Sequence, residues 1–190
     1  MALFFDTETT GLPLKRPFPN GKRPKNKSNY RDLVAFDTAR LVSLAWQLGE
    51  DGPLQHFFVQ PLDFVIPPEA TAIHGISQEQ AMAQGISFSE GIARFLADIA
   101  QAQVLVAHNL DFDKAIIKSE LLRASATSLP KVPRHFCTMR EACTRLGLVR
   151  WPRLSNLYRM LTGQEPDSAQ LHTASYDMQL CCACYTLLLK

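Results

Sequence analysis

The 190-residue sequence contains no apolar run near the ~20 residues that a membrane-spanning helix requires. Its first residues contain no basic segment followed by a cleavage site, so we expect no signal peptide and a cytoplasmic, membrane-free protein. Its five cysteines are an odd number, which argues against a disulfide framework and fits a reducing compartment. We find no internal repeat. At this length we expect one domain that spans residues 1–190.

Negative charge is missing from one long segment near the N-terminus. Between Thr9 and Arg31 the chain has no Asp or Glu, but it has seven Lys and Arg residues. The net charge of +2 therefore divides into +7 in this segment and −5 elsewhere. Four prolines also fall within residues 13–38, which predicts a long basic loop inserted into the domain. Such a loop suits contact with a phosphodiester backbone, and a solvated arm is the alternative.

The remaining pattern predicts an α/β fold with a mixed central sheet, in which three antiparallel strands are followed by parallel strands and flanking helices. The second and third strands form a hairpin around the turn at residues 50–53. Ser87 and Glu90 form a capping box for the first long helix. The expected strands are residues 2–6, 40–48, 54–60, 104–107 and 133–137. The expected helices are residues 89–102, 113–123, 138–147, 154–161 and 173–189.

The most informative residues lie at the end of the first expected strand. Asp6 and Glu8 are two positions apart, so on a strand both side chains point to the same face. Two carboxylates on one side of a buried strand repel each other and lose solvation unless a cation neutralises them. Carboxylate oxygens favour Mg²⁺ or Mn²⁺. Taken alone, the pair is also compatible with a solvated strand end, so a metal site needs further acids.

Two further acids stand out by their positions in the sequence. Asp113 follows the buried strand at 104–107, near its carboxyl end. Asp177 opens the last helix, five positions after His172. Individually, each acid is also compatible with a helix cap or a partner of the helix dipole, and His172 with a structural histidine.

Taken in order, these motifs resemble those of the DnaQ-like (DEDDh) family of 3′–5′ exonucleases, which includes the proofreading epsilon subunit of bacterial DNA polymerase III. The resemblance covers the whole chain apart from residues 13–38, and segments 65–77 and 151–154 also match the family's intervening sequences. The three motifs are FFDTETTGL at residues 4–12, the H-N-x-x-F-D pattern of His108, Asn109, Phe112 and Asp113, and the H-x-x-x-x-D pattern of His172 and Asp177.

The resemblance implies an RNase H-like fold and phosphodiester hydrolysis with two Mg²⁺ or Mn²⁺ ions. It implies that Asp6 bridges both ions, that Glu8 and Asp177 complete the tighter site, and that Asp113 holds the second ion. His172 is implied to be the general base, and an imidazole titrates close enough to neutral pH to accept a proton from water.

The resemblance also implies contacts with the 3′-terminal nucleotide. Thr9, Gly11 and Leu12 are expected to approach this nucleotide, with Leu12 acting as an apolar wedge against the base. His74 and Asn109 are expected to lie near it, although His74 is equally compatible with a structural contact.

Two nearby sets of residues have simpler interpretations. Asp111 is not part of the family pattern, and we interpret it as the N-cap of the following helix. Cys181, Cys182 and Cys184 lie within a periodic helix and lack the ligand spacing of a zinc site, so we expect them to serve packing.

The leading functional interpretation is a metal-dependent exonuclease that releases nucleoside 5′-monophosphates from the 3′ end of single-stranded or frayed DNA, in repair or proofreading. An exoribonuclease of the ribonuclease T or oligoribonuclease type is the second interpretation, since no residue reads a 2′-OH unambiguously. A proofreading module bound to a polymerase is the third, and the short segment after Asp177 argues against it.

Overall fold

The computed structural model describes residues 1–15, 29–126 and 128–190. Within these residues, five strands form one mixed sheet in the order β3-β2-β1-β4-β5. The pairs β1·β2 and β2·β3 are antiparallel, whereas β1·β4 and β4·β5 are parallel. The mixed α/β sheet expected from the sequence is therefore confirmed. The strands are β1 (Ala2–Thr9), β2 (Leu41–Leu48), β3 (Gln55–Phe58), β4 (Val104–Ala107) and β5 (Arg134–Cys137).

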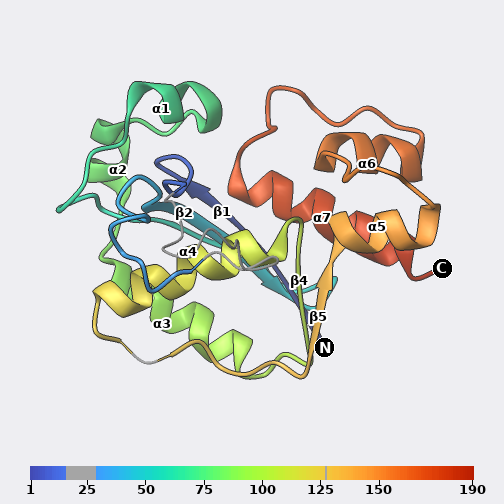
Figure 1. The fold of residues 1–190 in the computed structure, drawn as a ribbon, viewed down its shortest axis with the longest axis horizontal. Helices are drawn as coiled ribbons and strands as arrows, with labels where there is room; N and C mark the ends of the chain where they lie inside the picture. Colours follow the sequence, from blue (N-terminus) through green and yellow to red (C-terminus); the bar gives the residue numbers. More distant parts are fainter. Residues whose placement is uncertain (16–28, 127) are drawn as a thin grey trace.

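Helices cover both faces of this sheet. Figure 1 shows α3 and α4 on one side of the strands and α5, α6 and α7 on the other. None of the helices in the described part of the chain could cross a bilayer, because none is long and apolar enough. The helices are α1 (Pro68–His74), α2 (Gln78–Gln84), α3 (Phe88–Ile99), α4 (Leu110–Arg123), α5 (Thr138–Leu146), α6 (Leu154–Thr162) and α7 (Ala174–Leu188).

The alternation of β1 side chains builds two separate cores. Leu3 and Phe5 point to the α3 side, where the Phe5 ring lies 5.5 Å from the ring of Phe95. Phe4 points to the α7 side and packs edge-on against Tyr185 at 5.3 Å. Asp6 and Glu8 continue the face of Phe4, so the strand carries its two acids to the side that α7 covers.

The elements with strong local signals lie close to their expected positions. The buried strand β4 has the expected bounds, and Ser87 caps α3 by accepting the backbone N–H of Glu90 at 3.2 Å. Helices α1 and α2 were not predicted. Each has seven residues, about two turns, which is too short for a hydrophobic period to stand out. Helix α1 also follows the N-cap residue Pro67, which offers no capping side chain.

The described ends of the segment at 13–38 contain turns and no helix or strand, as expected for a loop. Its returning part, residues 29–38, lies beside α4 (Figure 1), where Nη2 of Arg123 donates to the carbonyl of Leu33 at 2.7 Å. Phe36 of this part is buried in the core on the α3 side. Most of the basic residues expected to contact a polynucleotide lie outside the described residues; these are Arg16, Lys22, Arg23, Lys25 and Lys27.

Candidate active site

The candidate active site lies where the C-terminal half of β1 meets the first turn of α7. Strand β1 extends to Thr9, three residues further than expected, so Asp6 and Glu8 both lie within the strand. Its pairing with β2 shifts register between Glu8 and Thr9, which is a local irregularity of the kind common beside active sites. Asp177 lies in the first turn of α7. Carboxylate oxygens of Asp6, Glu8 and Asp177 all lie within 4.8 Å of one another.

Asp113 lies beside this carboxylate cluster rather than within it. It comes from the first turn of α4 and is only 3% exposed. The Thr7 hydroxyl donates to Oδ1 of Asp113 at 2.7 Å, so the residue between Asp6 and Glu8 positions the fourth acid. The sequence analysis did not identify Thr7. Strand alternation placed it on the opposite face from the acids, and no local pattern indicated that Asp113 would reach it.

Burial raises the pKa values of all four acids, and repulsion from neighbouring carboxylates raises those of Asp6 and Glu8 further. Burial raises the pKa of Asp6 well above its usual range, and the charges of Asp113, Glu8 and Asp177 raise it further. Burial and the charges of Asp177 and Asp113 raise the pKa of Glu8 to about 9. Burial also raises the pKa of Asp113 to about 7, against the hydrogen bond from Thr7. Four acids in one place are therefore costly to ionise unless positive charge joins them.

The donor set fits a divalent cation. Oδ1 of Asp177 is buried and has no hydrogen-bond partner, although a buried carboxylate oxygen ordinarily has one. It belongs to a group of carboxylates that are hard oxygen donors, as Mg²⁺ and Mn²⁺ prefer. An ion held by Asp6, Glu8 and Asp177 would satisfy that oxygen and remove the repulsion among the acids.

His172 is exposed immediately before α7 and has a left-handed backbone conformation, with φ of 63°. Burial raises the pKa of Asp177 to about 6, while the charge of His172 and a hydrogen bond from its backbone both lower that pKa. The imidazole therefore lies close enough to the cluster to influence an acid in it. The sequence motif by itself showed only that His172 precedes Asp177 by five positions.

The segment that follows the acids leads outward from the cluster. The Thr9 hydroxyl donates to the carbonyl of Gly11 at 2.8 Å, and the Leu12 side chain is 73% exposed. Gly11 has φ of 153°, and an added Cβ would lie 3.0 Å from the carbonyl oxygen of Thr38. This close approach explains why glycine occupies the turn. Leu12 thus presents an apolar surface to solvent four residues after Glu8, and its role as a wedge stays a prediction.

His74 and Asn109 lie in different environments. His74 is the last residue of α1 and is 5% exposed, and its ring lies toward the backbone of Thr9. Its Nδ1 accepts a hydrogen bond from the backbone N–H of Ile76 at 3.1 Å. Asn109 is exposed and left-handed, with φ of 68°, where the chain turns from β4 into α4. His74 therefore packs against the Thr9 segment, whereas Asn109 presents its side-chain amide at the surface.

His108 is half-buried and connects three parts of the chain. Its Nδ1 lies 2.9 Å from the hydroxyl of Thr138, and its Nε2 lies 3.1 Å from the carbonyl oxygen of Pro152. Burial lowers the pKa of His108 to about 4, so the ring is neutral at physiological pH and bonds through one donor and one acceptor nitrogen. Through these two contacts, His108 connects the end of β4 to α5 and to the segment before α6.

The expectation that Asp111 caps α4 is wrong. Asn109 is the N-cap residue, and α4 begins at Leu110, three residues earlier than expected. The left-handed conformation of Asn109 starts the helix directly after β4. Asp111 lies inside the first turn and pairs with Arg140 at 3.0 Å. The expectation that Cys181, Cys182 and Cys184 serve packing agrees with their burial. Cys181 and Cys184 are buried free thiols, and Cys182 is a half-buried one.

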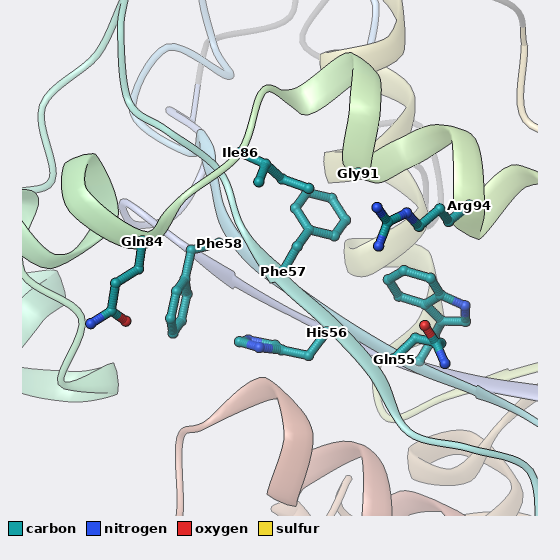
Figure 2. Close-up of a pocket in the computed structure, with 9 residues that line it drawn as sticks. Gln55, His56, Phe57, Phe58, Gln84, Ile86, Gly91 and Arg94 are labelled. Carbon is teal, nitrogen blue, oxygen red and sulfur yellow. The ribbon is translucent and has the colours of Figure 1, made fainter.

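A separate hollow of about 330 Å³ lies at the outer edge of β3. Figure 2 shows Phe57 and Ile86 on one side of that strand and His56 and Phe58 on the other. None of the residues expected in the active site lines it. Gly91 also lines this hollow. A larger residue would not fit there, because an added Cβ would lie 2.4 Å from the ring of Phe57. The hollow is therefore separate from the acidic cluster.

Comparison with solved structures identifies the fold as RNase H-like. Exonuclease X in complex with 5′ overhanging duplex DNA is 23% identical, with a TM-score of 0.64 over all of this chain and 91% of that one. A structure of exonuclease I has a TM-score of 0.71 at 20% identity and covers 98% of this chain. This chain spans 40% of that exonuclease I chain.

Comparison at the sequence level gives the family. Ribonuclease T of Yersinia pestis is 25% identical over 153 residues, covering 76% of this chain and 69% of that protein. Ribonuclease T of Citrobacter koseri is 26% identical over 155 residues. The family model described as "Exonuclease" (RNase_T) matches residues 3–185. Because that match covers nearly the whole chain, the protein belongs to the DnaQ-like family of 3′–5′ exonucleases, hydrolases of the RNase H-like superfamily.

Proposed function

We propose that this protein removes nucleotides from the 3′ end of single-stranded or frayed DNA and releases nucleoside 5′-monophosphates. The observation that carries the proposal is the cluster of Asp6, Glu8 and Asp177, in which a buried carboxylate oxygen lacks any hydrogen-bond partner. The preference for DNA draws support from the fold relatives, since exonuclease X and E. coli exonuclease I were solved with 5′ overhanging duplex DNA and with a dT13 oligonucleotide.

In this proposal Asp6, Glu8 and Asp177 hold one divalent cation, and Asp113 with Asp6 holds a second. Two such cations, when bound, favour ionisation of the attacking water and stabilise the charge that develops on the leaving 3′ oxygen. His172 accepts the proton of the attacking water. The Thr7 hydroxyl keeps Asp113 oriented.

The residues around the acids would select a free 3′ end. Leu12 is exposed and apolar, so it can pack against the terminal base without reading its sequence. Thr9, Gly11 and the Asn109 amide supply polar groups for the sugar and phosphate. The buried ring of His74 lies against the backbone of Thr9, so it can hold that segment in place when the segment meets the nucleotide.

The proposal is tested with matched DNA oligomers labelled at the 5′ or the 3′ end and incubated with Mg²⁺, Mn²⁺ or EDTA. We expect a descending ladder from the 5′-labelled oligomer, immediate release of labelled mononucleotide from the 3′-labelled one, and no reaction in EDTA. Shortening from the 5′ end, or activity that persists in EDTA, would refute the proposal.

An exoribonuclease is the second candidate, because the sequence relatives are named ribonuclease T. RNA differs from DNA only by the 2′-OH and the methyl group of thymine, and the proposed contacts do not discriminate strongly between them. The ratio of kcat/KM for RNA and DNA oligomers of equal length and equivalent sequence decides between the candidates. A ratio above one would reverse the substrate preference proposed above and leave the chemistry intact.

A further inference from the structure

A line of basic side chains follows the outer surface of α4, starting one residue after Asp113. Lys114 and Lys118 lie one helical turn apart on this helix and are half-buried. Neighbouring elements extend the line at both ends. The α4 basic stripe, as we name this surface, consists of Arg31, Lys114, Lys118, His135 and Arg140.

Side-chain contacts connect the members of the stripe. Nζ of Lys114 lies 3.3 Å from Nδ1 of His135, which is exposed on the edge strand β5. Lys118 lies over the Tyr30 ring at 5.2 Å, and Arg31 lies 5.6 Å from the same ring. The stripe therefore runs from β5, across α4, to the segment at residues 29–38, which Figure 1 shows beside α4.

The acids near the stripe are already engaged. Asp111 lies within it and pairs with Arg140 at 3.0 Å. Asp37 of the adjacent segment pairs with Arg123 at 2.7 Å, and Asp32 accepts the backbone N–H of Ala35 at 3.3 Å. Asp111 and Asp37 are therefore each paired with an arginine, and a group of like charges held this close favours a polyanionic ligand.

The electrostatic surroundings of His135 agree with this preference. Burial lowers the pKa of His135, and the charges of Lys114, Lys118 and Arg140 lower it further, whereas Asp111 raises it. Three cations act on the ring against one acid. The local potential is therefore positive at the centre of the stripe.

The position and length of the stripe suit a nucleic-acid backbone. Lys114 and Lys118 are separated by about 6 Å along the axis of α4. That length spans about two phosphates at the spacing of about 3.4 Å per nucleotide on one strand of B-DNA. The stripe begins near the start of α4, and the first turn of this helix carries Asp113, so a strand on the stripe could continue toward the acidic cluster.

We propose that the α4 basic stripe binds the phosphates of the substrate strand on the 5′ side of the nucleotide being removed. The assignment rests on the proposed exonuclease function for its ligand. It adds a second contact region, which holds the strand by its backbone without reading its sequence. Affinity should consequently increase with strand length until the stripe is filled.

The test compares Lys118→Gln with Arg94→Gln, which removes one positive charge from an exposed position on α3. Lys118 is preferred to Lys114 because it lies further from Asp113. Fluorescence anisotropy of labelled dT12 is measured in EDTA over a series of salt concentrations. For Lys118→Gln we expect about fivefold weaker binding at 0.1 M salt and a slope of log Kd against log salt that is lower by about 0.7, the value for one phosphate contact on a single strand.

Kinetics with Mg²⁺ supply the second measurement. The ratio of KM for dT3 to KM for dT12 should fall in Lys118→Gln, because only the longer strand reaches the stripe. An unchanged salt slope, or equal effects of Lys118→Gln and Arg94→Gln, would overturn the proposal. A loss seen only with duplexes that carry a recessed 3′ end would assign the stripe to the complementary strand and also overturn it.

These outcomes are independent of the proposed chemistry. If the unaltered protein fails to shorten dT12 with Mg²⁺ or Mn²⁺, the proposed function fails, whatever the anisotropy shows. If it shortens dT12 but Lys118→Gln binds and turns over like Arg94→Gln, only the stripe is refuted.

Discussion

The hydroxyl of Thr7 donates a hydrogen bond of 2.7 Å to Oδ1 of Asp113, although the two residues are 106 positions apart. This bond joins β1 to α4 at the edge of the acidic cluster. It also lowers the pKa of Asp113 against the effect of burial, so it favours the ionised form that could bind a cation.

Replacing Thr7 by valine, which preserves shape, should lower activity at neutral pH. Loss of a hydrogen bond to a charged group costs about 1.5–3 kcal/mol, which corresponds to a rise of about one to two units in the pKa of Asp113. The acidic limb of the kcat profile should therefore move to higher pH. Thr7→Ser is the matched control and should keep the original profile. An unshifted limb in Thr7→Val would show that the bond does not tune Asp113.

Asp113→Asn and Asp111→Asn should differ sharply, although both remove an acid from the first turn of α4. Asp113 is buried beside the cluster, and its loss should lower kcat by at least about 100-fold. The Asp111 side chain is 44% exposed and pairs with Arg140, so its loss should leave most of the activity. Equal losses in single-turnover assays of the two variants would contradict the assignment of Asp113.

Divalent ions should stabilise the protein, and more strongly as pH rises. An acid whose pKa is raised by folding holds its proton more tightly in the folded state. The metal-free protein should therefore lose stability from pH ~4 upward, through the folded values of about 6 for Asp177, 7 for Asp113 and 9 for Glu8. In EDTA, Tm should fall between pH 5 and pH 9, and Mg²⁺ or Mn²⁺ should reverse most of this fall.

Glu8→Gln is the control for that experiment. It removes the acid with a pKa of about 9, so Tm in EDTA should depend less on pH and should respond less to metal. An EDTA curve that rises steadily from pH 5 to pH 9 in the unaltered protein would contradict the electrostatic account of the cluster.

His172→Gln should separate catalysis from metal binding. If the imidazole accepts the proton of the attacking water, its removal should lower kcat by about 10²–10⁴-fold. The increase in Tm caused by Mg²⁺ should persist, because His172 is not among the grouped carboxylates. A variant that lost both activity and the metal-dependent increase in Tm would indicate a structural role instead.

Arg40→Met should destabilise the fold through a partner on α4. Nε of Arg40 lies 2.7 Å from Oε1 of Glu120, and both side chains are less than 10% exposed. Removing one member of a buried ion pair costs about 3–5 kcal/mol, because the other charge is left unpaired. Urea denaturation should show this loss, and the double variant Arg40→Met/Glu120→Gln should recover part of it. Additive losses would show that the two charges do not interact.

The sequence by itself determined the features that depend on local geometry. Strand alternation placed Asp6 and Glu8 on one face, the continuous apolar run located β4, and the hydroxyl of Ser87 marked the start of α3. These features require only neighbouring residues, because backbone periodicity and caps act over a few positions. The order of the three acidic motifs along the chain also indicated the exonuclease family.

Only the tertiary structure decided which distant groups meet. Asp177 joins Asp6 and Glu8 because α7 packs along β1, and Thr7 reaches Asp113 because α4 packs on the other face. The start of α4 also depended on the left-handed turn of Asn109, which excluded Asp111 from the cap. The α4 basic stripe likewise joins residues of three elements and a loop. Such contacts follow from packing across the sheet, and no local pattern of the sequence encodes that packing.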